Sequence, residues 1–214
     1  MTKPNGFLSV PKDVDRTGGG GRAVKLQEVN PMTKTKLLTA AAILACGFAG
    51  SALAADPMVG GAPMYASKNI VQNAVNSKDH TTLVTAVKAG GLVKTLEGKG
   101  PFTVFAPTNE AFAALPAGTV DNLLKPENKK ELDKILTYHV VPGRLYSAKL
   151  DEAIEKGGGK ATLKTVEGDP LTITGSGTDL MVTDSKGNTA KVTIANVMQS
   201  NGVIMVIDKV LMPS

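Results

Sequence analysis

The sequence contains few of the residues on which reactive chemistry usually depends. Its 214 residues include one cysteine, two histidines and no tryptophan. The cysteine, Cys46, lies in an apolar stretch near the N-terminus, so the rest of the chain can form no disulfide and no thiolate nucleophile or metal ligand. Two histidines without a further cysteine also argue against a transition-metal centre. We expect neither a metal nor a cofactor.

Recognisable catalytic and contact motifs are also absent. The sequence has no G-x-S-x-G nucleophile motif, no Walker motif and no dinucleotide-binding glycine pattern. It has no Arg-Gly-Asp tripeptide either, which excludes an integrin-type contact made through that tripeptide. These absences predict that the protein is not an enzyme.

The main part of the chain lacks a strong charge of either sign. The formal net charge of the whole sequence is +5, but from Ala55 onward 17 Lys and Arg face 16 Asp and Glu. The excess of positive charge therefore belongs to the N-terminal stretch. With few aromatic residues to stack on bases, the remaining chain lacks the usual features of a nucleic-acid-binding protein.

Residues 32–54 have the order of features that defines a secretory signal peptide. Lys34 and Lys36 form a short positive region, residues 37–48 are almost wholly apolar, and Ala52-Leu53-Ala54 is an A-x-A cleavage site. The apolar run is shorter than the roughly 20 residues that a transmembrane helix needs. We therefore predict an exported protein with no transmembrane segment in its mature chain.

The start of the chain leaves one alternative open. A signal peptide begins the translated chain, so Met32 is a better start than Met1, and residues 1–31 are interpreted as a leader or an over-called start. Ile43-Leu44-Ala45-Cys46 loosely resembles a lipobox, in which the cysteine is acylated. Leu44 is large for its place in that pattern. We therefore favour a secreted, extracellular or periplasmic protein over one that is lipid-anchored through Cys46.

The mature chain is predicted to consist of a short arm and one domain. Residues 55–64 contain proline and glycine, and we expect them to form a flexible arm. Residues 65–214 form the domain. As far as about Val141, apolar residues recur mainly at helical spacing, with one short strand at residues 102–106.

Short apolar runs separated by turn residues predict that the second half consists of antiparallel strands. The last run is apolar at every position from Val203 to Ile207, so this strand should be central and covered on both faces. Helices followed by strands in one chain indicate the α+β class. The predicted strands cover residues 162–166, 171–174, 180–183, 191–197 and 203–211.

Three segments together resemble the signature blocks of the fasciclin, or FAS1, family. They are Gly100 to Phe112 (GPFTVFAPTNEAF), Leu136 to Gly143 (LTYHVVPG) and Asn201 to Pro213 (NGVIMVIDKVLMP). The blocks occur in the order and with the spacing of that family, and the resemblance covers residues 65–214. It implies the FAS1 fold, a wedge of two β-sheets with helices packed on it.

The resemblance also implies a function and a contact site. Fasciclin domains are extracellular or surface-attached and mostly mediate adhesion rather than catalysis, and in animal members the Tyr-His block is tied to receptor binding. In this sequence that block is Tyr138-His139, which we take as the candidate binding residues. The family usually has a histidine where Met205 stands, which argues against proton transfer or metal binding at that position.

The positions of Tyr138 and His139 on the helical wheel predict different degrees of solvent exposure for the two side chains. Tyr138 has more polar neighbours than His139 and is expected to reach the solvent. A phenol suits a contact surface there, because its ring is apolar and its hydroxyl can stay solvated. His139 lies on the apolar side with Leu132 and Leu136, which favours a core histidine whose ring nitrogens are satisfied internally over a partner-binding residue at the helix end. His80 precedes a predicted helix start and is expected to lie at the surface or to cap that helix.

Three functions follow from these observations. The first is a binding module for adhesion or extracellular recognition, with a cell-surface or extracellular protein or polysaccharide as its partner. The second is a carrier that holds a small apolar ligand between sheet and helices, which requires an apolar cavity. The third is a cell-wall hydrolase with paired carboxylates. Its candidate acids, Asp151, Glu152 and Glu155, lie in a charged run that is more typical of a solvated helix face.

Overall fold

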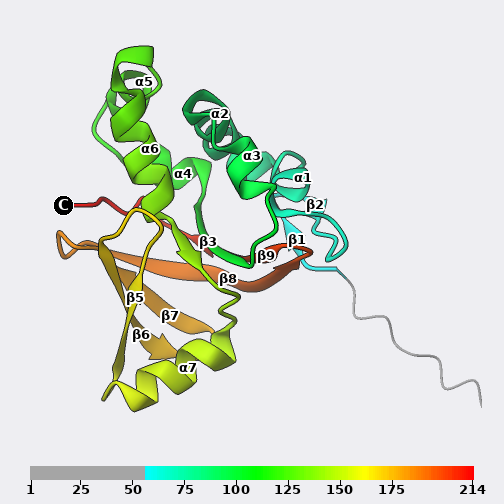
Figure 1. The fold of residues 1–214 in the computed structure, drawn as a ribbon, viewed down its shortest axis with the longest axis vertical. Helices are drawn as coiled ribbons and strands as arrows, with labels where there is room; N and C mark the ends of the chain where they lie inside the picture. The colour runs from blue at the N-terminus through cyan, green and yellow to red at the C-terminus, as the bar shows by residue number, and fades with distance from the viewer. Residues whose placement is uncertain (1–55) are drawn as a thin grey trace, which may run out of the picture. The chain divides into compact units, whose positions relative to one another are not determined.

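The computed structural model describes residues 56–214. The leader expected over residues 1–31, the signal peptide over residues 32–54 and Cys46 lie outside the described residues. Within them, Figure 1 shows α1 to α6 on one side of β8 and β9, with α7 and β5 to β7 on the other side. This arrangement confirms the α+β class.

The helices are short and most lie in the first half of the described chain. They are α1 (Ile70–Ala74), α2 (Thr81–Gly90), α3 (Val93–Leu96), α4 (Asn109–Ala113), α5 (Thr119–Leu123), α6 (Lys129–Tyr138) and α7 (Ser147–Lys156), with 3-10 turns η1 (Lys78–His80) and η2 (Pro126–Asn128).

The strands form one large sheet and one small hairpin. They are β1 (Met58–Val59), β2 (Ala62–Pro63), β3 (Phe102–Pro107), β4 (Val140–Pro142), β5 (Lys160–Lys164), β6 (Pro170–Ser176), β7 (Asp179–Thr183), β8 (Thr189–Gln199) and β9 (Gly202–Ile207). The large sheet has the order β4-β3-β9-β8-β7-β6-β5. The β3–β9 pair is parallel, and the other pairs are antiparallel.

The long strand β8 turns this sheet into the two layers of a wedge. Residues 189–191 pair with β7, whereas residues 192–199 pair with β9. The register between β8 and β9 shifts twice, and Asn196 has a left-handed backbone with φ of 59°. Such bulges bend a strand and increase its twist. The wedge of two sheets expected from the resemblance is therefore confirmed.

β9 lies between two separate apolar cores, because successive side chains of a strand point to opposite faces. Ile204 and Val206 pack with the helices α1 to α6. Val203, Met205 and Ile207 face β5 to β7 and α7. All five side chains are buried, which confirms the prediction of a central strand covered on both faces.

Local capping signals explain where several helices begin and end. Asn69 caps α1, and its side chain and that of Gln72 form a reciprocal capping box. The hydroxyl of Thr108 accepts a hydrogen bond from the N–H of Ala111 and caps α4. Gly91 ends α2 in the left-handed conformation.

The structure differs from the sequence-based expectation in the arm. Instead of a flexible arm over residues 55–64, residues 58–63 form the β1–β2 hairpin. Gly60 and Gly61 both have positive φ, as a tight hairpin turn requires. Val59 and Met64 are buried against the helical core. Their apolar side chains fix a segment that its proline and glycine content alone suggested was mobile.

Asn201, in the turn between β8 and β9, connects two helices to the sheet. Its Oδ1 accepts a hydrogen bond from the N–H of Ile70 (3.0 Å). Its Nδ2 donates to the carbonyls of Leu96 (2.7 Å) and Gly98 (3.0 Å). This one side chain therefore fixes the start of α1 and the end of α3 against the sheet.

We expect Asn201→Ala to lower the free energy of unfolding by about 2 kcal/mol, because it leaves these partly buried backbone groups without a partner. Urea denaturation measures the change. The matched control is Asn122→Ala on the exposed surface of α5, which should change stability by less than about 0.5 kcal/mol. Equal losses for the two variants would contradict this role of Asn201.

Candidate functional site

The first candidate contact residue, Tyr138, is fully buried, with 0% of its surface exposed. Its hydroxyl donates a hydrogen bond to the carbonyl of Pro170 (2.9 Å) and accepts one from the N–H of Ser185 (2.9 Å). Burial raises the pKa of this phenol. The expectation that Tyr138 reaches the solvent is therefore wrong, because the start of β6 at Pro170 and the turn that contains Ser185 cover the end of α6.

The second candidate, His139, is also in the core, with 2% of its surface exposed. Its Nδ1–H donates to the carbonyl of Ile135 (2.8 Å), and its Nε2 accepts from the N–H of Leu211 (3.0 Å). Burial lowers its pKa to about 4, so the ring is neutral at pH 7. His139 is thus the core histidine that its place on the apolar side of the helix favours, and the Tyr138-His139 pair forms no exposed contact surface.

An apolar cavity of about 80 Å³ lies between the helices and the sheet, and we call it the helix–sheet pocket. Four helices (α1, α2, α3 and α6) and four strands of the large sheet (β3, β4, β8 and β9) line it, together with Val59 of the small hairpin. Its lining is almost entirely aliphatic. Central lining residues include Ile70, Leu83, Val87, Val104, Val197 and Ile204.

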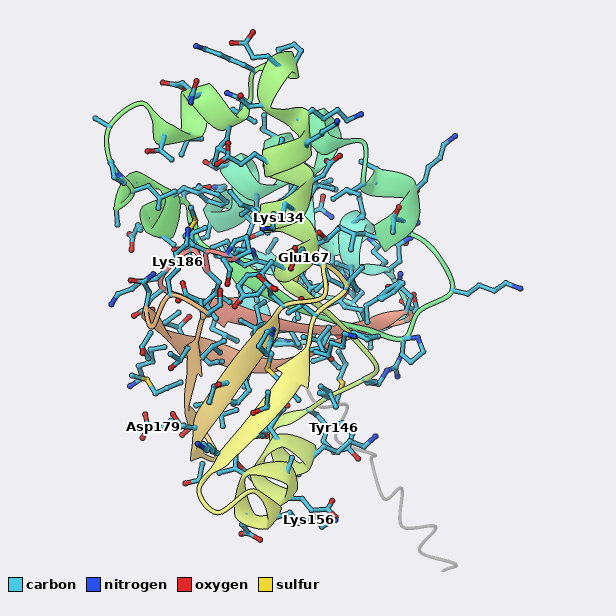
Figure 2. All side chains as sticks on the ribbon, turned by 60° about the vertical axis from the view of Figure 1, so that its left-hand side comes forward. Lys134, Tyr146, Lys156, Glu167, Asp179 and Lys186 are labelled. Carbon is cyan, nitrogen blue, oxygen red and sulfur yellow. The ribbon has the colours of Figure 1, made fainter. Side chains whose placement is uncertain are left out.

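The mouth of the helix–sheet pocket is marked by the lining residues that reach solvent. Val166 is 45% exposed, and Lys88 and Thr95 are also exposed. Val166 lies in the loop between β5 and β6, where its N–H donates to the carbonyl of Val140. Lys134 and Glu167, which lie close together in Figure 2, connect α6 to this loop with an ion pair of 3.8 Å. The exposed rim of the pocket therefore combines an apolar side chain, Val166, with a cationic one, Lys88.

The second histidine of the described chain, His80, also lines the helix–sheet pocket. It is only 3% exposed, and it makes no side-chain capping bond to α2. Its Nδ1 lies 2.8 Å from the hydroxyl oxygen of Ser77. Its Nε2 is buried and has no hydrogen-bond partner among the described residues. The expectation of a surface or capping role for His80 is therefore wrong.

Burial also determines the charge state of His80. It lowers the pKa of the ring, although the Ala106 backbone and the Asp79 carboxylate act in the opposite direction. The Ala106 carbonyl does not satisfy Nε2 with hydrogen-bond geometry, since that atom remains unpaired. The ring of His80 is therefore neutral at pH 7, and its unpaired atom, Nε2, belongs to the lining of an otherwise mostly aliphatic pocket.

The acids considered for hydrolysis all lie on α7. Asp151 accepts a hydrogen bond from the N–H of Gly177 (2.9 Å), and Glu152 pairs with Lys156 across one turn of the helix. This pairing lowers the pKa of Glu152. Glu155 is exposed. The three carboxylates thus have the surroundings of a solvated helix face. Within residues 56–214, no group of three or more His, Cys, Asp or Glu could hold a metal ion.

Comparison with known families identifies the domain. Residues 78–213 match the family model described as the fasciclin domain, and this match covers more than half of the chain. The chain belongs to the fasciclin domain family. The resemblance carried by the three sequence blocks is therefore confirmed, and this fasciclin domain has bacterial relatives.

Three similar proteins show the range of the family. A Synechocystis protein called sll1483 is 48% identical over 146 residues, which is 67% of this chain and 73% of that protein. The cell surface glycolipoprotein MPB83 of Mycobacterium bovis is 35% identical over 179 residues, covering 75% of this chain and 74% of the relative. A FAS1 domain pair from the insect cell adhesion molecule fasciclin I has a TM-score of 0.46 and 26% identity, with 61% and 45% of the two chains covered.

Membership in the family gives coarse information on function. Fasciclin domains occur in adhesion and surface proteins that are generally not enzymes, and relatives of this fasciclin domain are secreted or lie at the cell surface. None of the helices in residues 56–214 has both the length and the apolar character needed to cross a membrane.

Sequence reasoning did not predict the helix–sheet pocket residue by residue. The helical spacing of the apolar residues in α1 and α2 indicates which side chains face the core, but such a pattern cannot show that they leave space between them. One signal was available for His80. It stands before two threonines that can cap a helix themselves, so the histidine itself was not needed as a cap.

Proposed function

We propose that this fasciclin domain is an exported recognition module that acts by binding, and that the helix–sheet pocket is its contact site. The single observation that carries the proposal is an apolar pocket that opens at the surface beside an exposed aliphatic side chain, Val166. The partner is a component of a cell surface or of the extracellular space that inserts an apolar group. The protein acts in the periplasm or outside the cell.

The chemistry of the pocket favours binding over catalysis. Its polar lining residues, His80, Lys88, Thr95, Thr137 and His139, do not include a nucleophile paired with a base or two carboxylates. Burying one aliphatic side chain is worth about 1.5–3 kcal/mol. An apolar group inserted past Val166 can therefore contribute a large part of the affinity of a single module.

A charge at the pocket mouth tests this proposal. Val166→Asp should weaken binding of the exported protein to envelope material of its native host by about tenfold or more, because the partner's apolar group would have to pass a carboxylate. The dissociation constant can be measured by surface plasmon resonance on immobilised envelope fragments, with circular dichroism to verify the fold.

Val75→Asp is the matched control for this experiment. Val75 is as exposed as Val166 (48% against 45%) but does not line the pocket. We expect this variant to bind like the wild type. If the two variants bind equally well, or lose binding equally, the pocket mouth is not the contact site.

A further inference from the structure

We propose that the helix–sheet pocket accepts a linear aliphatic chain that carries a hydroxyl group, and that His80 recognises the hydroxyl. This inference rests on the proposed function, because it specifies the chemistry of the group that enters the same pocket. It is carried by one buried polar atom without a partner, Nε2 of His80, in a cavity whose lining is otherwise almost wholly apolar.

The size of the cavity and its open mouth favour a linear chain. Its volume is about 80 Å³, and its lining includes the exposed residues Lys88, Thr95 and Val166. An apolar cavity that binds benzene has about 150 Å³. A ring would have to enter this smaller volume as a whole, whereas an extended chain can insert its hydroxyl end and leave its other end at the mouth. Met64, a flexible side chain in the lining, can adjust to its end.

The charge state of His80 selects the polar group of the ligand. Because burial lowers the pKa of the ring, His80 is neutral, and a carboxylate beside it would be a buried charge without a counter-ion. Nε2 is a donor or an acceptor, depending on whether the Ser77 hydroxyl donates to Nδ1 or accepts from it. A hydroxyl can accept as well as donate, so it pairs with Nε2 in either tautomer.

A single water molecule is a poor alternative occupant. A buried water typically makes about three hydrogen bonds to polar groups that lack other partners. The pocket offers one such atom, because both ring nitrogens of the other lining histidine, His139, are already paired. An aliphatic chain with one hydroxyl group makes one hydrogen bond and otherwise apolar contacts, so it fits this lining better than a water molecule does.

Binding of 1-hexanol and of n-hexane to the whole exported protein tests the inference. Both ligands are applied at the same fraction of their aqueous saturation, which removes their difference in hydrophobicity. We expect 1-hexanol to bind about tenfold more tightly, since one hydrogen bond to a buried group distinguishes the two. Nuclear magnetic resonance measures the affinities and reports on the ring nitrogens of His80. The 15N resonance of Nε2 should shift with 1-hexanol only.

A variant and a third ligand complete the design. In His80→Leu the preference for 1-hexanol over n-hexane should disappear, while n-hexane still binds. Hexanoate should bind the wild type more weakly than 1-hexanol. The inference is overturned if the wild type binds both neutral ligands equally or binds neither, if hexanoate binds best, or if Nε2 does not respond. Loss of envelope binding in Val166→Asp together with equal binding of both ligands would retain the proposed function and reject the hydroxyl.

Discussion

Replacing Tyr138 by alanine is expected to lower the free energy of unfolding by about 4 kcal/mol or more, which is a large share of the stability of a typical domain. The side chain has no exposed surface, and its hydroxyl joins the end of α6 to the start of β6 and to the turn that contains Ser185. Truncation would leave a cavity in the core shared by β5 to β9 and α7. Urea denaturation followed by circular dichroism measures the loss.

Two further tyrosine variants separate packing from hydrogen bonding. Tyr138→Phe keeps the ring but leaves the Pro170 carbonyl and the Ser185 N–H without their partner, and should cost about 2 kcal/mol. Tyr146→Ala is the control, because Tyr146 is only half-buried beside α7 and its ring contacts the ammonium of Lys149. It should cost less than about 1 kcal/mol.

This prediction also changes how binding data on Tyr138 must be interpreted. A Tyr138→Ala variant that fails to bind a partner would be expected from loss of the fold alone. A Tyr138→Ala variant that stays as stable as the wild type would instead contradict the buried position described above. Measurement of stability must therefore accompany any binding assay at this position.

The second large effect is a loss of stability in acid that comes from His139. Its pKa is about 4 in the folded protein and 6.5 in an ordinary histidine. Because the folded ring resists protonation, the unfolded state takes up a proton first as the pH falls. Stability from this group is therefore fully present above about pH 6.5 and is lost as the pH falls toward 4. The loss amounts to about 3 kcal/mol.

Urea denaturation at pH 7.0 and pH 4.5 tests this expectation, with His139→Gln as the comparison. Replacement removes the titrating ring, so most of the difference in stability between the two pH values should disappear, even though the variant is less stable at pH 7. His80 contributes a smaller loss with the same sign, because its pKa is also lowered. An equally steep pH dependence in wild type and variant would show that other groups cause it.

The fold was largely predictable because its local signals agree with its tertiary contacts. The run from Val203 to Ile207 has no polar position, and it forms the strand that both cores share. Thr108 and Gly91 act at the helix ends where their residue types are favoured. Such features depend on neighbours within a few residues, and a single sequence displays them directly.

The candidate site was less predictable because distant residues determine it. Tyr138 has polar neighbours on its helix, but it is covered by segments 32 and 47 residues further along the chain. The N–H of Val166 donates to the carbonyl of Val140 in β4, which lies far from it in the sequence. The unpaired Nε2 of His80 is a property of the space around it. No periodicity along the chain encodes these relations.

The position of β9 has a consequence for the timing of folding during synthesis. β9 follows every other described helix and strand in the sequence, and it contributes side chains to both cores. Neither core can therefore close before this strand has been synthesised. β3 can pair with β4 and β8 with β7 earlier, but the edges of β3 and β8 that β9 occupies remain unpaired until then. The described helices and strands therefore cannot complete their packing until β9 has been made.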